Sequence, residues 1–502
     1  MKNQNYQPTI GLEIHVELKT KTKMFCACLN ETWKIGQEEL LPNKNICPVC
    51  MGHPGTLPAI NKEAVKMVIK TGLALNSTIA EKSKFDRKQY FYPDLPKGYQ
   101  ISQYDQPLCS GGELEINGKK IGITRIHLEE DTGKLSHSTA ATLIDYNRAG
   151  VPLMELVTEP DINSALEAKE FCQELQLILR ELEVSDADME KGQMRCEVNI
   201  SLSATKELGT KVEIKNLNSF RSVERAVNYE IERQTKALES GEKIMQETRG
   251  WNDTKQETYT QRVKEGSADY RYFPEPDLPP LDFSQDSEID LAALKNSLPE
   301  LPAQKRARFM NAETGFNAAD AKILMSDPLL ADYVEQVISE LKIWLKDSGV
   351  FEGTEEEIWL ENKDKVNKLV TGWLFSKLGG LLTARKLGWN QNTISAENFA
   401  EFITMLFTRQ VSTKNANLLL ERMLETGGDP SNILVDENLN QSDDFNLAAV
   451  VDGVINTNPA QVQEFKAGKS VLIKFFLGAV MKESKGQADP VEAENMLLQK
   501  LS

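Results

Sequence analysis

The sequence contains no segment that would direct the chain to or across a membrane. No positively charged start followed by an apolar stretch opens it, no Arg-rich transit pattern is present, and no run of about 18 apolar residues occurs. Basic residues are also in deficit, since 58 Lys and Arg stand against 75 Asp and Glu, giving a formal net charge of -17. We therefore expect a cytoplasmic protein without a membrane partner, in which local basic patches hold any nucleic acid.

The usual nucleotide-binding and amidase sequences are missing as well. Residues 468–470 (GKS) are preceded five residues earlier by Gln463, so no G-x-x-x-x-G-K-[ST] loop is formed, and no G-x-G-x-x-G follows an expected strand. Cys109, Cys172 and Cys196 have no motif-level His partner, and no Ser-Ser-Lys amidase signature occurs. A nucleotide would have to be held through metals, and the sequence offers no motif for an activated Cys or Ser nucleophile.

The sequence is long and apolar enough for about three domains, with 502 residues of which 40% are hydrophobic. Up to about residue 290, short alternating segments are mixed with amphipathic helical patterns at 61–76, 164–183 and 219–242. A proline-rich segment at 270–284 closes this part, and the pattern is then mostly helical. We predict an α+β fold with an antiparallel sheet and domains at 1–295, 296–430 and 431–502.

Four of the seven cysteines lie close together in the sequence. FCACLN supplies Cys26 and Cys28, and NICPVC supplies Cys47 and Cys50. Two close pairs separated by a loop provide the four thiolates of a tetrahedral zinc site, and four protein ligands leave the metal no open position for catalysis. The pattern predicts a structural zinc-binding insertion near residues 26–50. Reduced, buried cysteines without a metal are the alternative.

The segment GLEIHVEL, residues 11–18, alternates apolar and polar side chains. In a strand, Glu13, His15 and Glu17 share one face, and the apolar residues share the other. Half-buried antiparallel strands often turn such polar residues toward solvent. The alternative is a cation site, which a single strand cannot complete.

Further carboxylates occur in comparable segments. Glu129 and Glu130 lie in IHLEED, Glu155 is embedded in the apolar VPLMELV, and Glu197 lies in the alternating RCEVNISLS. Several carboxylates brought together repel one another unless a divalent cation neutralises them, and Mg²⁺ prefers oxygen ligands completed by substrate phosphates. The candidate magnesium ligands, for which scattered surface acids and core histidines are the alternative, are Glu13, His15, Glu129, Glu130, Glu155 and Glu197.

Basic and amide side chains in the same region are candidates for phosphate or acyl contacts. They are Arg148 in DYNRAG, Lys215 and Asn216 in EIKNLN, and Arg271 in ADYRYF. Each of these residue types also occurs in ordinary surface ion pairs, which is the alternative interpretation.

The final block of the sequence, from about residue 431, combines lysines with an apolar, glycine-punctuated pattern that predicts a helical hairpin. Such a hairpin presents either a basic surface to a phosphate backbone or ordinary solvated helix faces. The candidate nucleic-acid-binding lysines are Lys466, Lys469, Lys474, Lys482 and Lys485.

Several long segments together resemble one known family, GatB, which is the B-type chain of aspartyl/glutamyl-tRNA amidotransferases. The resemblance runs in order along essentially the whole chain. It rests on GLEIHVEL, FCACLNE with CPVCMGHPG, YFYPDLPKGYQISQYDQP, IHLEEDTGK, DYNRAGVPLMELVTEPDI, EIKNLNSFRSVERA, DYRYFPEPDLPPL and FLGAVMKESKGQADP.

The resemblance implies a cradle-like catalytic domain related in fold to glutamine synthetase, followed by an all-α helical domain and a small helical tail that bind tRNA. It implies that the side-chain carboxylate of a mischarged Glu-tRNA(Gln), Asp-tRNA(Asn) or both is phosphorylated with ATP and Mg²⁺ and then amidated by ammonia. The magnesium ligands fall on the six residues named above; at position 197 this chain has Glu where relatives commonly have Asp.

The resemblance also implies partner chains. The amidase GatA would supply ammonia through an internal tunnel, the small protein GatC would complete a heterotrimer, and a nondiscriminating aminoacyl-tRNA synthetase is a further partner. Two other classes remain open from the residues alone. One is a self-sufficient small-molecule ligase of the glutamine synthetase type, and the other is a zinc-bearing RNA-binding scaffold. The archaeal relative GatE carries an insertion for which a chain of this length has no room.

Overall fold

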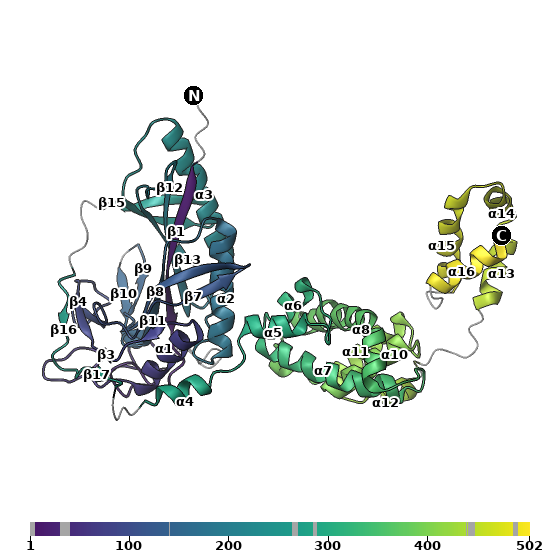
Figure 1. Ribbon diagram of the computed structural model, residues 1–502, viewed down its shortest axis with the longest axis horizontal. Coiled ribbons are helices and arrows are strands. Elements are labelled where there is room, and N and C mark those ends of the chain that lie inside the picture. Colours follow the sequence, from purple (N-terminus) through teal and green to yellow (C-terminus); the bar gives the residue numbers. More distant parts are fainter. Residues whose placement is uncertain are drawn as a thin grey trace. The chain divides into compact units, whose positions relative to one another are not determined.

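The computed structural model describes residues 6–30, 41–139, 141–263, 270–284, 289–437, 439, 447–484 and 490–501. They form two compact units that divide between Gln304 and Lys305 (Figure 1). The domain limits expected at 295/296 and 430/431 fall inside two short helices, α4 (Leu291–Asn296) and α12 (Pro430–Asp436).

The first unit is built on a ten-stranded sheet in the order β15-β14-β13-β12-β1-β11-β8-β6-β2, with β7 paired to β8. All its pairs are antiparallel except β13 with β14, which is parallel. The strands are β1 (Gln7–Glu17), β2 (Thr78–Ile79), β6 (Cys109–Ser110), β7 (Glu113–Ile116), β8 (Lys119–Glu130), β11 (Pro152–Thr158), β12 (Met194–Ser203), β13 (Val212–Leu217), β14 (Glu247–Asn252) and β15 (Glu257–Val263).

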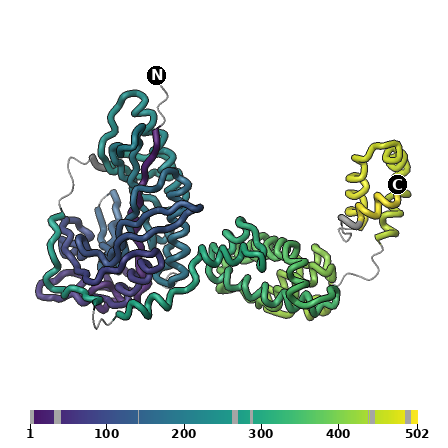
Figure 2. Tube along the Cα trace, in the orientation of Figure 1, coloured from purple at the N-terminus to yellow at the C-terminus, as the bar shows by residue number. Residues whose placement is uncertain are grey.

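Strand β1 lies in the interior of this sheet although it comes first in the chain. Figure 2 shows its purple trace among blue and teal segments from later in the sequence. The expected alternation is confirmed, because Leu12, Ile14 and Val16 are fully buried in the core while Glu13 and His15 remain partly accessible on the other face.

Three helices supply the core that covers the apolar face of the sheet: α1 (Lys62–Ala74), α2 (Ala165–Glu181) and α3 (Phe220–Glu239). Each begins where the sequence provides an N-cap side chain, Asn61, Ser164 or Ser219, which accepts hydrogen bonds from backbone N–H groups of the first turn. Helices α2 and α3 lie side by side (Figure 1). The mixture of one large sheet with separate helices confirms the α+β prediction.

Smaller sheets and a short helical turn complete the first unit. The strands β4 (Asp86–Gln89), β5 (Tyr99–Ser102) and β16 (Phe273–Pro274) form a three-stranded sheet in the order β16-β4-β5. The other pairs are β9 (Lys134–His137) with β10 (Thr142–Asp145), and β3 (Lys82–Ser83) with β17 (Leu281–Asp282). The 3₁₀ turn η1 (Tyr146–Arg148) leads into β11.

The described part of the second unit is helical. Its elements are α5 (Pro302–Phe309), α6 (Ala318–Leu324), α7 (Pro328–Asp347), α8 (Glu355–Thr371), the π-helix η2 (Gly372–Leu378), α9 (Gly379–Ala384), η3 (Trp389–Gln391), α10 (Ala396–Phe407), α11 (Thr413–Thr426), α12, α13 (Leu447–Thr457), α14 (Pro459–Lys466), η4 (Ser470–Leu472), α15 (Ile473–Glu483) and α16 (Pro490–Leu501). Within the described ranges, no helix has both the length and the apolar composition needed to span a bilayer.

The last four helices share a small core of their own. Val451 and Val454 from α13 pack with Phe476 and Val480 from α15, and Leu497 of α16 completes the group. Burial of these apolar side chains holds α13–α16 together as a small helical bundle.

Candidate functional site

The polar face of the sheet brings His15, Glu129 and Glu155 together from three neighbouring strands. Cross-strand pairing places His15 of β1 opposite Glu155 of β11. His15 Nε2 lies 3.4 Å from Glu155 Oε2 and 3.7 Å from Glu129 Oε1. One ligand atom of each residue lies within 4.8 Å of the other two, so these side chains, here called the His15 cluster, can hold a metal ion.

A second imidazole, that of His127 on β8, is buried beside the His15 cluster. His127 Nε2 lies 3.3 Å from Glu155 Oε2, and cross-strand pairing sets the two residues opposite each other. Burial alone raises the pKa of Glu155, but the charges and hydrogen bonds of His127 and His15 outweigh it and hold that pKa well below its usual range. Glu155 is therefore a carboxylate at neutral pH.

The charge of His15 is set by the same carboxylates. Burial lowers its pKa, but hydrogen bonding to Glu155 and attraction from Glu155, Glu129 and Glu197 outweigh burial and raise the pKa to about 9. Without a metal ion, His15 is thus protonated at neutral pH and acts as the cation of the cluster.

A second acidic group, here called the Glu13 cluster, lies beside the first on the same face. Ligand atoms of Glu13, Glu197 and Glu213, from strands β1, β12 and β13, lie within 4.8 Å of one another. Lys215 neutralises part of this charge, since its Nζ lies 2.7 Å from Glu197 Oε2 and 3.4 Å from Glu213 Oε1. Asn199 donates a hydrogen bond of 2.8 Å to Glu13 Oε1.

Glu130 does not join either cluster, although its neighbour Glu129 does. Consecutive side chains of a strand point to opposite faces. Glu130 forms an ion pair with Lys97 and accepts a 2.9 Å hydrogen bond from the backbone N–H of Ile101. Together with Cys26 and Cys50, both Lys97 and Glu130 line a cavity of about 70 Å³ on the cysteine-bearing side.

Arg148 lies in a hydrogen-bonded network next to the clusters. Its guanidinium donates to the backbone carbonyls of Thr132 and Gly133 at 3.1 and 3.0 Å, and its Nε lies 3.5 Å from the buried Asp131. Arg195 Nη2 binds the same carboxylate at 2.9 Å. Burial raises the pKa of Asp131, but the two guanidinium groups outweigh burial and lower it.

The remaining candidate phosphate contacts both have a positive φ, Asn216 inside strand β13 and Arg271 outside the named strands. Asn216 has a φ of 65°, is exposed, and its amide lies 3.5 Å from the Tyr259 hydroxyl. Arg271 has a φ of 43° and is exposed in the segment that leads into β16. Neither residue is among those that form the two acidic clusters.

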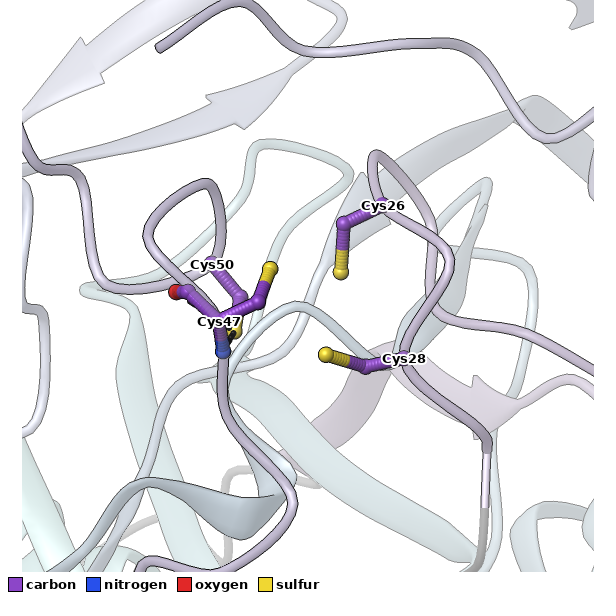
Figure 3. Close-up of side chains that lie close together, drawn as sticks. All are labelled: Cys26, Cys28, Cys47 and Cys50. Carbon is purple, nitrogen blue, oxygen red and sulfur yellow. Dashed lines mark hydrogen bonds between the residues drawn. The ribbon is translucent and has the colours of Figure 1, made fainter.

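The four cysteines of the expected zinc site do come together. The Sγ atoms of these four residues, Cys26, Cys28, Cys47 and Cys50, all lie within 4.8 Å of one another. Figure 3 shows the sulfur atoms from two loops directed into one shared space, with the backbone N–H of Cys47 donating to Cys50 Sγ at 3.1 Å. Thiolates at this spacing suit a tetrahedral metal with Zn–S bonds of about 2.3 Å.

A buried lysine balances the charge of this cysteine cluster. Lys23 Nζ lies 4.0 Å from Cys50 Sγ and donates to the Asn45 carbonyl at 3.0 Å. Hydrogen bonding to Cys26 lowers the pKa of the Cys50 thiol well below its usual value, and the Lys23 ammonium adds to this effect. Four thiolates around a divalent ion carry a net negative charge, which the ammonium reduces.

The candidate tRNA-binding lysines of the last domain are all exposed where the structure describes them. Lys466 ends α14, Lys469 precedes η4, and Lys474 and Lys482 lie on α15. Lys469 Nζ is paired with Glu464 at 2.8 Å. Lys485 lies outside the described residues.

Glu213 is the member of the acidic clusters that sequence reasoning missed. It stands in the segment EIKNLN, two residues before Lys215, and alternation alone would have put the two on one face. Only the pairing of β13 with β12, which sets Glu213 opposite Asn199, brings it to Glu13 and Glu197.

Comparison with known proteins decides the family. Residues 8–288 match the GatB/GatE catalytic domain family, and residues 356–501 match the GatB domain family. The chain belongs to the GatB family. The acidic clusters and the cysteine cluster therefore lie within the GatB/GatE catalytic domain, and the candidate lysines lie within the GatB domain.

Curated relatives agree over almost the full chain. The aspartyl/glutamyl-tRNA(Asn/Gln) amidotransferase GatB protein of Crocosphaera subtropica is 44% identical and covers 99% of this chain and 97% of its own length. The corresponding amidotransferase proteins of Thermosynechococcus vestitus, 45% identical with 99% and 97% covered, and of Persephonella marina, 42% identical with 99% of each chain covered, are similar. As a GatB protein the chain is one component of a ligase-type amidotransferase.

Proposed function

We propose that this GatB chain carries the kinase and transamidase site of a tRNA-dependent amidotransferase. Its substrate would be Glu-tRNA(Gln), Asp-tRNA(Asn) or both, and its products the corresponding Gln-tRNA and Asn-tRNA used in translation, in the cytoplasm. The side-chain carboxylate would attack the γ-phosphorus of ATP, ADP would leave, and ammonia would then displace phosphate from the acyl phosphate. The observation that carries this proposal is the pair of adjacent acidic clusters on one sheet face of the catalytic domain.

The two clusters fit magnesium through their donor atoms. Glu13, Glu197 and Glu213 offer carboxylate oxygens, and the other cluster adds one imidazole to the oxygens of Glu129 and Glu155. Bound Mg²⁺ would neutralise the phosphate oxygens during phosphoryl transfer. This chain's residues would hold the ions on strands whose positions the sheet fixes. Because Glu130 is turned to the opposite face and paired with Lys97, we place it outside the ligand sets.

Basic side chains near the clusters would then order the phosphate and acyl groups. Lys215 already bridges Glu197 and Glu213, and it can turn an ammonium toward a γ-phosphate once those carboxylates bind a cation. Arg148 would act indirectly, through Asp131 and the turn at residues 132–133. Asn216 and Arg271, both exposed, remain candidates for direct nucleotide contact.

The cysteine cluster would hold a structural zinc ion. Its four sulfurs supply a closed set of ligands, and the neighbouring Lys23 offsets the negative charge. The ion would fix the loops at 26–30 and 45–53 against the body of the catalytic domain.

The domain organisation and partners follow the family. We propose a cradle-like domain of the glutamine synthetase type up to about residue 295, a helical domain to about 430, and a tail domain whose exposed lysines bind tRNA. Since the sequence lacks a glutaminase motif, ammonia would come from the amidase GatA, with the small protein GatC in the assembly and a nondiscriminating aminoacyl-tRNA synthetase delivering the tRNA.

The test uses the chain with the partner proteins that copurify with it, supplied with ATP, Mg²⁺ and ammonium chloride in place of glutamine. Phosphate release and amide formation are followed separately on Glu-tRNA and Asp-tRNA. We expect turnover that requires mischarged tRNA, and a loss of at least about 100-fold in kcat for Glu155→Gln, because an oxygen ligand and its charge are removed at the reacting phosphate. Glu115→Gln, at an exposed position of β7, should retain activity.

Two results would contradict the proposal. Consumption of free glutamate or aspartate without tRNA would instead identify a small-molecule ligase. Full activity of the Glu155→Gln complex would show that the carboxylate clusters are not the phosphoryl-transfer site.

A further inference from the structure

A group of tyrosines next to the strands of the three-stranded sheet has no role in the two acidic clusters. Tyr104 and Tyr272 stack with ring centroids 4.2 Å apart and planes inclined by 10°. Tyr270 meets Tyr272 edge-on at 6.1 Å and Tyr90 at 6.0 Å. We call Tyr90, Tyr104, Tyr270 and Tyr272 the tyrosine platform.

The outer ring of the platform is open to solvent. Tyr104 is 59% exposed although its ring is already stacked on Tyr272, which is only half-buried. Tyr270 is 36% exposed. Aromatic rings contribute most to stability when they are buried, so an ordered, stacked and open ring is better suited to binding than to packing.

The opposite face of the same small sheet shows a different arrangement. There, Arg87 covers the rings of Tyr99 and Phe273 at 4.4 and 5.7 Å, and its guanidinium is paired with the buried Glu275 at 2.7 Å. The rings of Tyr99 and Phe273 thus contact a guanidinium that is itself held by a buried carboxylate. Among the described residues, no arginine is found over the ring of Tyr104, whose ring contact is the stack on Tyr272.

The platform lies next to the His15 cluster. Ser102, the last residue of β5, donates a 3.0 Å hydrogen bond to Glu129 Oε2, and Tyr104 follows two residues later, at most about 7 Å along the extended chain. The ammonium of Lys88 lies 5.2 Å from the Tyr270 ring centre. Burial lowers the pKa of Lys88, but the charges of Glu129, Tyr272 and Glu155 outweigh burial and raise it, so this side chain stays cationic beside the cluster.

We propose that the tyrosine platform stacks the terminal base of the single-stranded 3′ end of the substrate tRNA, an inference that rests on the proposed function. Aromatic rings bind unpaired bases by stacking, and a nearby ammonium attracts the connecting phosphate. The terminal nucleotide carries the amino acid, so a base held on Tyr104 leaves the aminoacyl group close to Glu129 and Glu155. A small nucleotide is a poorer match, because small-molecule sites enclose most of their ligand whereas Tyr104 is 59% exposed.

Steady-state kinetics of the assembled complex test the platform. With ammonium chloride and saturating ATP, Tyr104→Ala should raise KM for the mischarged tRNA roughly tenfold while kcat and KM for ATP stay unchanged, since base stacking is what the substitution removes. Tyr104→Phe should behave like the wild type, because the ring and not the hydroxyl carries the stack. Phe273→Ala is the matched control, since this ring is 42% exposed on the same sheet but contacts Arg87.

Equilibrium binding without turnover gives an independent measurement. Wild-type complex should bind tRNA lacking its 3′-terminal adenosine roughly tenfold more weakly than intact tRNA, whereas the Tyr104→Ala complex should bind the two tRNAs alike. A tenfold preference retained by Tyr104→Ala would overturn the inference, and so would an increase in KM for ATP in place of KM for tRNA. Failure of the wild-type complex to use mischarged tRNA would contradict the proposed function itself.

Discussion

His15 shows how a single residue of the proposed magnesium site would couple metal binding to pH. When no metal is present, its protonated imidazole supplies the positive charge that holds Glu129 and Glu155 together. A metal ion that binds the imidazole would have to displace this proton. Metal affinity of this cluster should therefore rise with pH.

The metal-free protein offers a direct measurement of this charge. We expect the imidazole of His15 to titrate near pH 9 by NMR in the presence of a chelator, and to lose its proton at neutral pH when Mg²⁺ is added. Because its folded-state pKa exceeds the unfolded value of 6.5, His15 stabilises the metal-free fold fully below pH 6.5. That contribution, up to about 3 kcal/mol, should disappear as pH rises through 9.

The control for this pH dependence is His15→Asn, which removes the titrating group. The free energy of unfolding of the metal-free variant should lack the decline between pH 6.5 and 9 that the wild type shows. Parallel curves for the two proteins would contradict the assignment.

Some members of the two acidic clusters could be predicted from the sequence, and others could not. Alternation along GLEIHVEL predicted that Glu13 and His15 share a face, and the structure confirms it. For the adjacent pair Glu129 and Glu130, alternation predicts that the side chains point to opposite faces of the sheet. It does not predict which of the two faces the His15 cluster. Glu213 depends on strand pairing across the sheet, which is non-local information.

At the scale of elements, helices could be predicted where an N-cap residue precedes apolar residues spaced three and four apart. The helices predicted at 61–76, 164–183 and 219–242 were found at Lys62–Ala74, Ala165–Glu181 and Phe220–Glu239. The parallel pairing of β13 with β14 was not predicted, because the helix between them, and not the strands, sets that direction.

Helix α2 provides a test of the core that supports the site. Phe171 is fully buried beneath the sheet, and Phe171→Ala should lower the free energy of unfolding by about 3–5 kcal/mol in urea denaturation, since it leaves a cavity. Leu166→Ala, on the same helix but 51% exposed, should change it by less than about 0.5 kcal/mol. Similar losses for the two variants would mean that α2 does not pack as described.

The cysteine loops provide a test at the same scale. We expect about one zinc ion per chain by elemental analysis, and Cys28→Ser should bring the zinc content close to zero and lower the melting temperature, because one of four thiolates is lost. Cys109→Ala removes a buried cysteine outside the cluster and should retain the zinc. Wild-type protein free of zinc after metal-supplemented expression would contradict the assignment.

At the scale of the whole molecule, the proposed function requires a chain with a net charge of -17 to bind an acidic nucleic acid. Local cations must therefore carry the attraction, and tRNA affinity should fall steeply with salt. Lys474 and Lys482 are the clearest candidates, as both are exposed on α15 and neither is ion-paired among the described residues.

Salt titrations of tRNA binding measure this contribution. Lys474→Ala and Lys482→Ala should each reduce the slope of log affinity against log salt by about 1, because each removes one phosphate contact. Lys500→Ala is the matched control in the same bundle, where the ammonium is already paired with Asp452 at 2.6 Å. An unchanged slope in the first two variants would place the tRNA elsewhere.

The interior position of β1 has a consequence for synthesis. Its two neighbours, β11 and β12, end at Thr158 and Ser203, so β1 is made long before either of its partners. At about 5–20 residues per second, β1 waits roughly 10–40 s on the ribosome with its apolar side chains unprotected. Nascent chains of this protein should accordingly depend on chaperones until residue 203 has left the exit tunnel.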